Sequence, residues 1–193
     1  MGKIMAVAAS YLTHLPTDEL VTDGNVLRAV VEVIKRRHEY RERQELETDP
    51  TWRQPIPYVL VTTPVPDTRY VAMTRMQGQG ETRLAGKKYI GAGGHVEEGH
   101  TIFYTALLEV TQELGVPLKS LELDGVLITT GGPVEDVHLC MFYRATTTYT
   151  NFTSPERDLH LAHWATREEL GKDFKDMEKW SQVIARDYLN IKG

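Results

Sequence analysis

The sequence predicts an α/β fold in which a mixed β-sheet is sandwiched between helices. Short apolar runs, such as residues 58–62 and 125–130, are typical of strands. They alternate along the chain with longer segments of helical periodicity. Strand segments lie on both sides of a central helical segment, and further helices flank them, which favours a layered sheet between helices.

The first part of the chain, residues 1–54, is predicted to be an extension packed on the main domain, residues 55–193. Residues 3–12 have the pattern of a strand. A helix is expected from Asn25 to His38, after the start signal Asp23-Gly24-Asn25. Residues 41–54 are charged and contain Thr48-Asp49-Pro50, so they are expected to form a loop that can fold over the site. The apolar face of the predicted helix consists of Val26, Leu27, Val30, Val31, Val33 and Ile34.

The main domain is expected to begin with two strands. Pro55 and Pro57 bracket the entry to a buried strand at residues 58–62. A turn at residues 64–67 leads to a returning strand at residues 70–74. After the central helix, residues 125–130 and 138–144 are predicted to form a hairpin, and residues 159–164 a further strand. Thr166 with Glu169 is a capping box that opens a helix, and residues 175–189 are predicted to form the last one.

The central helix is predicted to start at Thr101, a plausible N-cap, and to stop at Gly115. Phe103, Leu107, Val110 and Leu114 recur at helical spacing and are expected to face the core. Glu109 and Glu113 are one turn apart, so their carboxylates lie on one face beside that stripe. Such a pair is often only a solvated surface, but it also suits a hard divalent cation such as Mg²⁺ or Mn²⁺.

The glycine-rich loop at residues 91–94 favours the metal interpretation of this pair. It precedes the helix and follows the apolar Tyr89-Ile90. Glycines permit close approach of the backbone to a ligand, so a phosphate and its metal could lie against this loop.

Composition excludes several classes of protein. Apolar residues make up 41% and charged residues 25%, which is ordinary for a soluble globular protein, and no apolar run is long enough to span a bilayer. The single cysteine, Cys140, is predicted to be a buried strand residue, which fits a reducing, cytoplasmic compartment. The net charge of −5 argues against a protein that holds nucleic acid mainly through its phosphates.

The stretch 93–116 resembles a Nudix box, the signature of the Nudix (MutT-type) hydrolases. Three box positions differ: His100 and Gln112 stand where the family has glutamates, and Leu108 where it has arginine. Segments 53–58, 80–86, 90–95, 137–139 and 178–181 resemble a subgroup of predicted MutT-type phosphoesterases that have an N-terminal extension. The matching box positions are Gly94, Glu109, Val110, Glu113, Gly115 and Val116.

The resemblance implies the Nudix fold and hydrolysis of a pyrophosphate linkage in a nucleoside diphosphate joined to another group. By position, Glu109 and Glu113 are the expected catalytic metal ligands, with a backbone carbonyl near Gly93 or Gly94. Gln112 can offer one neutral oxygen to the metal. His100 could bind Mn²⁺ or accept a proton, or be an ordinary polar residue before the helix.

Other charged residues are expected to complete the site. Arg75 and Arg83 are candidates to replace the missing arginine or to bind phosphate. Glu98, beside His100, or Glu135 could supply the missing carboxylate, as could Glu97 and Asp136. His95 and His138 recur in the subgroup pattern and are expected to line the substrate site.

Two hypotheses of function follow from the altered box. The leading one is a Mg²⁺- or Mn²⁺-dependent pyrophosphohydrolase acting on a nucleotide-like diphosphate. The alternative is a Nudix-fold module that binds a nucleotide or a protein partner without turnover. Nucleic acid is not an expected partner, except as an RNA end, and the sequence leaves the oligomeric state open, a dimer included.

Overall fold

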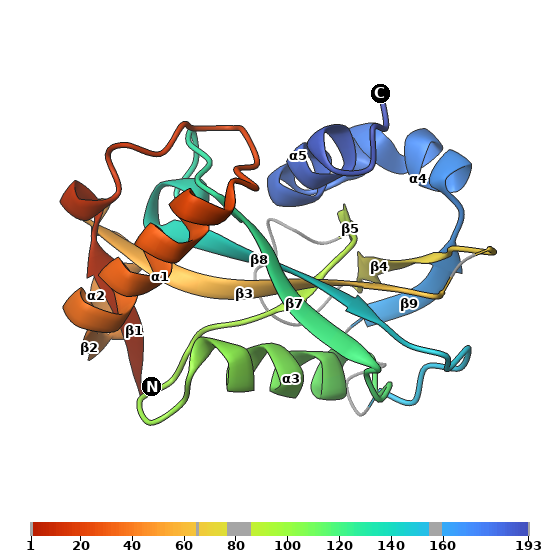
Figure 1. Ribbon diagram of the computed structural model, residues 1–193, viewed down its shortest axis with the longest axis horizontal. Coiled ribbons are helices and arrows are strands. Elements are labelled where there is room, and N and C mark those ends of the chain that lie inside the picture. The colour runs from red at the N-terminus through yellow and green to blue at the C-terminus, as the bar shows by residue number, and fades with distance from the viewer. Residues whose placement is uncertain (1, 65, 77–85, 155–159, 193) are drawn as a thin grey trace.

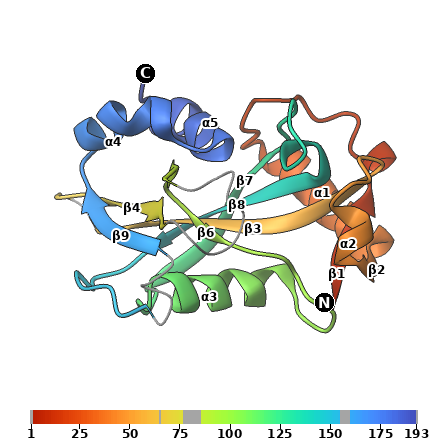
Figure 2. The same cartoon turned by 180° about the vertical axis from the view of Figure 1, so that it is seen from behind.

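In the computed structural model, residues 2–64, 66–76, 86–154 and 160–192 are described. A mixed sheet lies between helices, with α3 (Ile102–Glu113) on one side and α4 (Arg167–Asp173) and α5 (Lys179–Asp187) on the other (Figures 1 and 2). This arrangement confirms the predicted α/β class. The N-terminal helix α1 (Gly24–Arg37) and the short α2 (Arg43–Leu46) lie at the end of the molecule opposite α4.

The strand β3 (Trp52–Thr62) organises the sheet. Along one edge it pairs in parallel with β8 (His138–Thr146), which in turn pairs antiparallel with β7 (Ser120–Leu127). Its other partners, all antiparallel, are β1 (Lys3–Ala8), β6 (Ala92–Gly93) and β4 (Tyr70–Arg75). The remaining pairs join β2 (Glu39–Glu42) to β1, and both β5 (Lys88–Tyr89) and β9 (His160–Ala165) to β4.

Local signals placed most helices correctly. Asp23 caps α1 by accepting hydrogen bonds from the backbone N–H groups of Asn25 and Val26, at 2.9 and 3.0 Å. Thr166 and Glu169 form the predicted capping box of α4. The last helix is shorter than predicted, because residues 174–176 form a separate 3₁₀ turn before α5. The predicted first strand also ends early, and a 3₁₀ turn follows at Ala9–Tyr11.

Two predictions about the chain before the glycine loop were wrong. Residues 41–54, expected to be a loop, contain the end of β2, the helix α2 and the start of β3. Pro55 and Pro57 lie inside β3 rather than at its entry. The division expected after Gln54 therefore falls within a single strand, whose first residues pair with β1 while the rest pair with β4, β6 and β8.

The buried face of α3 differs from the predicted stripe. Val110 and Leu114 are buried as expected, but Phe103 is 50% and Leu107 37% exposed. Ala106 instead faces the core, at 0% exposure. The helix meets the sheet through small side chains on this face, which places the Glu113 side of α3 against the sheet as well.

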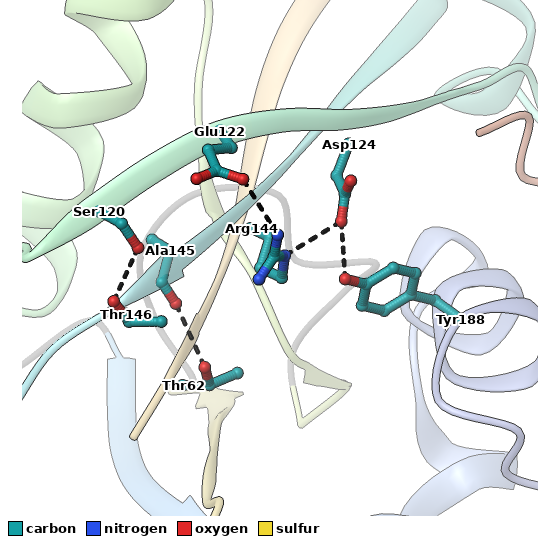
Figure 3. Close-up of polar contacts among 8 residues, drawn as sticks. All are labelled: Thr62, Ser120, Glu122, Asp124, Arg144, Ala145, Thr146 and Tyr188. Carbon is teal, nitrogen blue, oxygen red and sulfur yellow. Dashed lines mark hydrogen bonds and ion pairs between the residues drawn. The ribbon is translucent and has the colours of Figure 1, made fainter. Parts of the chain in front are cut away.

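A polar network fastens the C-terminal helix to the sheet. Figure 3 shows Asp124 of β7 between Arg144 of β8 and Tyr188, the residue after α5. The Tyr188 hydroxyl donates to Asp124 Oδ2 at 2.6 Å, and Arg144 Nε donates to the same oxygen at 3.1 Å. The ring of Tyr188 also packs edge-on against Phe142. These contacts hold α5 in place above the cavity described next.

Candidate active site

A cavity of about 1010 Å³ lies between the sheet and α5. Its walls come from distant parts of the chain: α2, β3, the glycine loop, the segment before β8 and the start of α5. A smaller hollow of about 450 Å³ is lined by none of the predicted site residues but by Thr63, Pro64, Asp67, Arg69, Thr148 and Thr150. The larger cavity is therefore the candidate site. Six predicted site residues line it: Arg75, Gly94, His95, Glu113, Glu135 and His138.

The two box glutamates lie near the glycine loop: Glu109 lies against Gly94, and Glu113 lines the cavity together with the loop. Thr101 caps α3 by accepting a hydrogen bond from Tyr104 N–H at 3.1 Å, which sets the register of the helix. In that register Glu113 is 8% exposed and lines the cavity together with Gly93 and Gly94. Glu109 lies against Gly94, because a Cβ added to that glycine would be 2.3 Å from Glu109 Oε1. The Glu109 carboxylate thus occupies the space that a side chain at position 94 would fill.

Two histidines form a hydrogen-bonded pair beside the glycine loop. His138 Nδ1 lies 2.6 Å from the carbonyl oxygen of Val134, so this nitrogen carries the proton and Nε2 is left as an acceptor. His95 Nε2 lies 3.2 Å from His138 Nε2 and is therefore the donor in the neutral pair. Burial, with smaller effects of Arg43 and His138, lowers the pKa of His95 to about 3. His95 is therefore uncharged at neutral pH.

Two aromatic side chains, Tyr58 of β3 and Trp180 of α5, line another part of the cavity. Trp180 packs edge-on against Tyr58 and against His138, with ring centroids 5.6 and 6.1 Å apart. Its indole N–H donates to Thr129 Oγ1 at 3.0 Å. The Tyr58 hydroxyl lies 2.8 Å from Ser181 Oγ, and both accept from the Ile90 N–H. These bonds tie the start of α5 to the strand and loop that lead to Gly94.

Arg75 is the predicted substitute for the arginine missing from the box, and it lies beside Glu113. Its Nε donates to Glu178 Oε1 at 2.7 Å, and its guanidinium lies 4.9 Å from the centre of the Tyr89 ring. Burial lowers the pKa of Arg75, but Glu178 and, less strongly, Glu113 hold it above the ordinary value. A cation is thus present next to the box carboxylates, although it comes from β4 and not from α3.

Glu135, in the turn before β8, also lines the cavity. Its carbonyl oxygen accepts a hydrogen bond from Arg53 Nη1 at 2.8 Å. Its carboxylate lies against Gly132, where a Cβ would be 2.1 Å from Oε2.

Three other predicted residues do not line the cavity. Glu98 is exposed in the loop before α3, and its N–H bonds to the carbonyl of Lys3 at 3.1 Å. His100 packs against Tyr104, with ring centroids 4.7 Å apart, at the far end of α3 from Glu113. Gln112 is partly buried, and its carbonyl accepts from Ser154 Oγ at 2.6 Å. Arg83 lies outside the described residues.

Several cavity residues were not predicted from the sequence. Some belong to the N-terminal extension and others to β3 and α5. Arg43 and Glu47 line the cavity but were predicted only as parts of a charged loop, and Lys87 lines it as well. Tyr58 and Trp180 lay within the segments 53–58 and 178–181 that carried the family resemblance, and this was the signal that could have found them.

In the part of the chain that the structure describes, no helix is both long enough and apolar enough to cross a membrane. Within residues 2–64, 66–76, 86–154 and 160–192, no three His, Cys, Asp or Glu side chains form a ready metal cluster. The donors at Gly94 still suit Mg²⁺ or Mn²⁺, because these ions prefer oxygen ligands and usually keep waters and substrate phosphates beside one or two carboxylates.

Comparison with known proteins places this geometry in context. No family model matches the chain. Protein YmaB of Bacillus subtilis (strain 168) is 31% identical over 160 residues, which cover 75% of this chain and 76% of YmaB. The crystal structure of Tm1382, described as a candidate Nudix hydrolase, matches 98% of this chain and 100% of that one, with a TM-score of 0.81 and 25% identity. The Nudix domain of Shewanella oneidensis NrtR, complexed with ADP ribose, matches 69% of this chain and 84% of that one at a TM-score of 0.55 and 11% identity.

Proposed function

This chain belongs to the Nudix superfamily, and we propose that it is a divalent-metal-dependent hydrolase of the pyrophosphate linkage in a nucleoside diphosphate joined to another group. The observation that carries the proposal is the position of the two box carboxylates: Glu109 lies against Gly94, and Glu113 lines the same large cavity as Gly93 and Gly94. Two carboxylates and backbone carbonyls are the oxygen donors that Mg²⁺ and Mn²⁺ require.

Glu109 and Glu113 would hold the metal, and Gln112, which lies outside the cavity lining, is on the same turns of α3. When bound, the metal neutralises phosphate charge and lowers the pKa of its water. Arg75, next to Glu113, would add positive charge where negative charge develops on the phosphate oxygens. Glu178 fixes the position of Arg75 through their 2.7 Å hydrogen bond.

His95 and His138 would contact the part of the substrate that lies beside the glycine loop. In its neutral form, His95 leaves its Nδ1 nitrogen as an acceptor for a hydroxyl or an amine of the substrate. Trp180 and Tyr58 supply flat apolar surface beside the pair, which suits a planar ring. The ADP ribose bound to the NrtR domain is a ligand of this chemical class.

A second function, binding without turnover, is favoured by one observation. Leu108 replaces the box arginine, and among the described residues no third acidic or histidine ligand joins Glu109 and Glu113. Fewer charged ligands weaken a metal site.

The deciding experiment is phosphate release from nucleoside triphosphates, dinucleoside polyphosphates, ADP-ribose and nucleotide sugars, each with Mg²⁺ and with Mn²⁺. Turnover that requires the metal is expected. Silence with every substrate and metal, while nucleotides still raise the melting temperature, would identify a binding module instead.

A further inference from the structure

The N-terminal extension supplies one wall of the cavity. Arg43, Glu47 and Thr48, from α2 and the residues after it, line the cavity together with the Nudix glycine loop. Figure 2 shows α2 beside β1 and the start of β3, at one end of the sheet. The cavity is therefore not formed by the Nudix core alone.

Buried contacts hold α2 in a fixed position. Leu46 is 1% exposed and packs in a small core with Ile4, Ala6 and Trp52. Gln54, also 1% exposed, donates from Nε2 to the carbonyl oxygen of Leu46 at 3.1 Å. A side chain on this short helix is therefore presented to the cavity from a rigid support.

Arg43 has hydrogen-bonding groups to offer from that support. Its Nε donates to Glu47 Oε1 at 2.8 Å, and its side chain is 42% exposed. Among the described residues, no hydrogen bond engages its two Nη groups. An arginine held through Nε presents its Nη groups as a pair of donors, which suits phosphate oxygens.

Arg75 and Lys179, two of the other three cations among the described residues that line the cavity, each pair with a carboxylate outside the proposed metal site. Arg75 is paired with Glu178 and covered by Tyr89, and Lys179 lies 3.1 Å from Asp18 Oδ1. Arg43 thus carries a charge that the proposed catalysis does not use.

The position of Arg43 indicates which group it would bind. Arg43 lines the same cavity as Gly94 and His95, so it faces the space proposed for the diphosphate. In nucleotide-like molecules, the anionic group closest to a diphosphate is the next phosphate of the same chain. The cavity, at about 1010 Å³, is at the upper end of the usual range for ligand sites and leaves room for it.

We propose that Arg43 forms a subsite for an additional phosphate, so that the preferred ligands carry at least one phosphate beyond the two joined by the cleaved bond. This inference rests on the proposed function. It also gives the extension a role, since removal of α2 would remove the subsite.

The test compares the binding of nucleoside diphosphates with that of triphosphates of the same base, for each of the four common bases. A metal chelator is present so that neither ligand is hydrolysed. Dissociation constants are measured for the wild type, Arg43→Gln, Arg43→Lys and the control Arg36→Gln. The control also breaks an i,i+4 pair with glutamate, Arg36 Nε to Glu32 Oε2 at 3.2 Å, but on α1 and away from the cavity. Such exposed pairs contribute little to stability, so all variants should melt like the wild type without ligand.

The wild type is expected to prefer triphosphate by about tenfold, the gain typical of one charge-assisted contact that is partly exposed. Arg43→Gln should remove this preference, Arg43→Lys should keep part of it, and Arg36→Gln should keep all of it. A preference unchanged in Arg43→Gln, or absent from the wild type while diphosphates are still cleaved, would overturn the subsite alone. If no nucleotide binds and none is cleaved, the proposed function fails with it.

Discussion

Arg75 of β4 donates a hydrogen bond from Nε to Oε1 of Glu178 at 2.7 Å, and this bond joins the sheet to the first residue before α5. The side chains are 36% and 18% exposed, so the pair is partly screened by solvent. The same arginine lies next to Glu113. One side chain thus couples the position of the C-terminal helix to the proposed metal site.

Replacing Arg75 by Gln is expected to cost about 1 kcal/mol of unfolding free energy, because a partly exposed charge-assisted bond is lost. The rate of hydrolysis should fall as well, since positive charge is removed beside Glu113. Urea denaturation of Arg75→Gln, Glu178→Gln and the double variant measures the coupling. Additive losses of stability would show that the pair contributes nothing.

Gly94→Ala is expected to slow hydrolysis at least about tenfold with little change in melting temperature. The new Cβ would lie 2.3 Å from Glu109 Oε1 and must displace the flexible end of that side chain, which is cheap for folding but moves a proposed ligand. Gly24→Ala is the control, because its Cβ would meet only Arg28 Nη1, at 3.6 Å. An active Gly94→Ala protein would remove Glu109 from the proposed site.

Gln112→Glu is expected to raise the rate at low metal concentration, because a third carboxylate on α3, beside Glu109 and Glu113, would strengthen metal binding. A Mg²⁺ titration of the rate, run in parallel for the wild type and the variant, measures the shift. A lower rate at every metal concentration would mean that the site requires the amide.

Tyr188→Phe is expected to destabilise the fold by about 1 kcal/mol, the usual value of one hydrogen bond. The contribution of the Tyr188–Asp124 hydrogen bond to stability is expected to depend on pH. Burial, together with Asp124, raises the pKa of Tyr188 from 10.0 to about 12. Because the folded pKa is the higher one, this contribution is complete below pH 10 and is lost as the pH rises from 10 toward 12.

Unfolding measured between pH 9 and 12 should therefore show a smaller loss of stability in Tyr188→Phe than in the wild type. Comparison of the two proteins cancels the titration of the other tyrosines. Equal slopes for the two proteins would contradict the predicted role of this hydroxyl.

Local patterns predicted much of the fold but not its edges. The capping groups Asp23, Thr101 and Thr166 act within a few residues, so the sequence reveals them. The strand β2 has no such signal, because its residues become a strand only by pairing with β1. The exposure of Phe103 and Leu107 has the same origin, since the orientation of α3 depends on its contact with the sheet.

The site could be predicted only where motif and geometry coincide. Glu109, Glu113 and Gly94 follow from the box, and the structure brings them together. Trp180 lies in segment 178–181, which carried the family resemblance, but nothing in the local sequence indicates that Arg43 of the extension reaches the same cavity. Long-range packing determines the cavity walls, and these walls carry the proposed specificity.

The most direct test of the central claim is the steady-state rate of phosphate release by Glu113→Gln with the best substrate of the panel and saturating metal. Glu168→Gln is the control, since Glu168 is exposed on α4 and pairs only with Lys172 among the described residues. The rate of Glu113→Gln should fall at least about a hundredfold, because a charged ligand for the metal is lost, while Glu168→Gln should match the wild type. A rate for Glu113→Gln equal to that of the wild type would contradict the proposed metal site on α3.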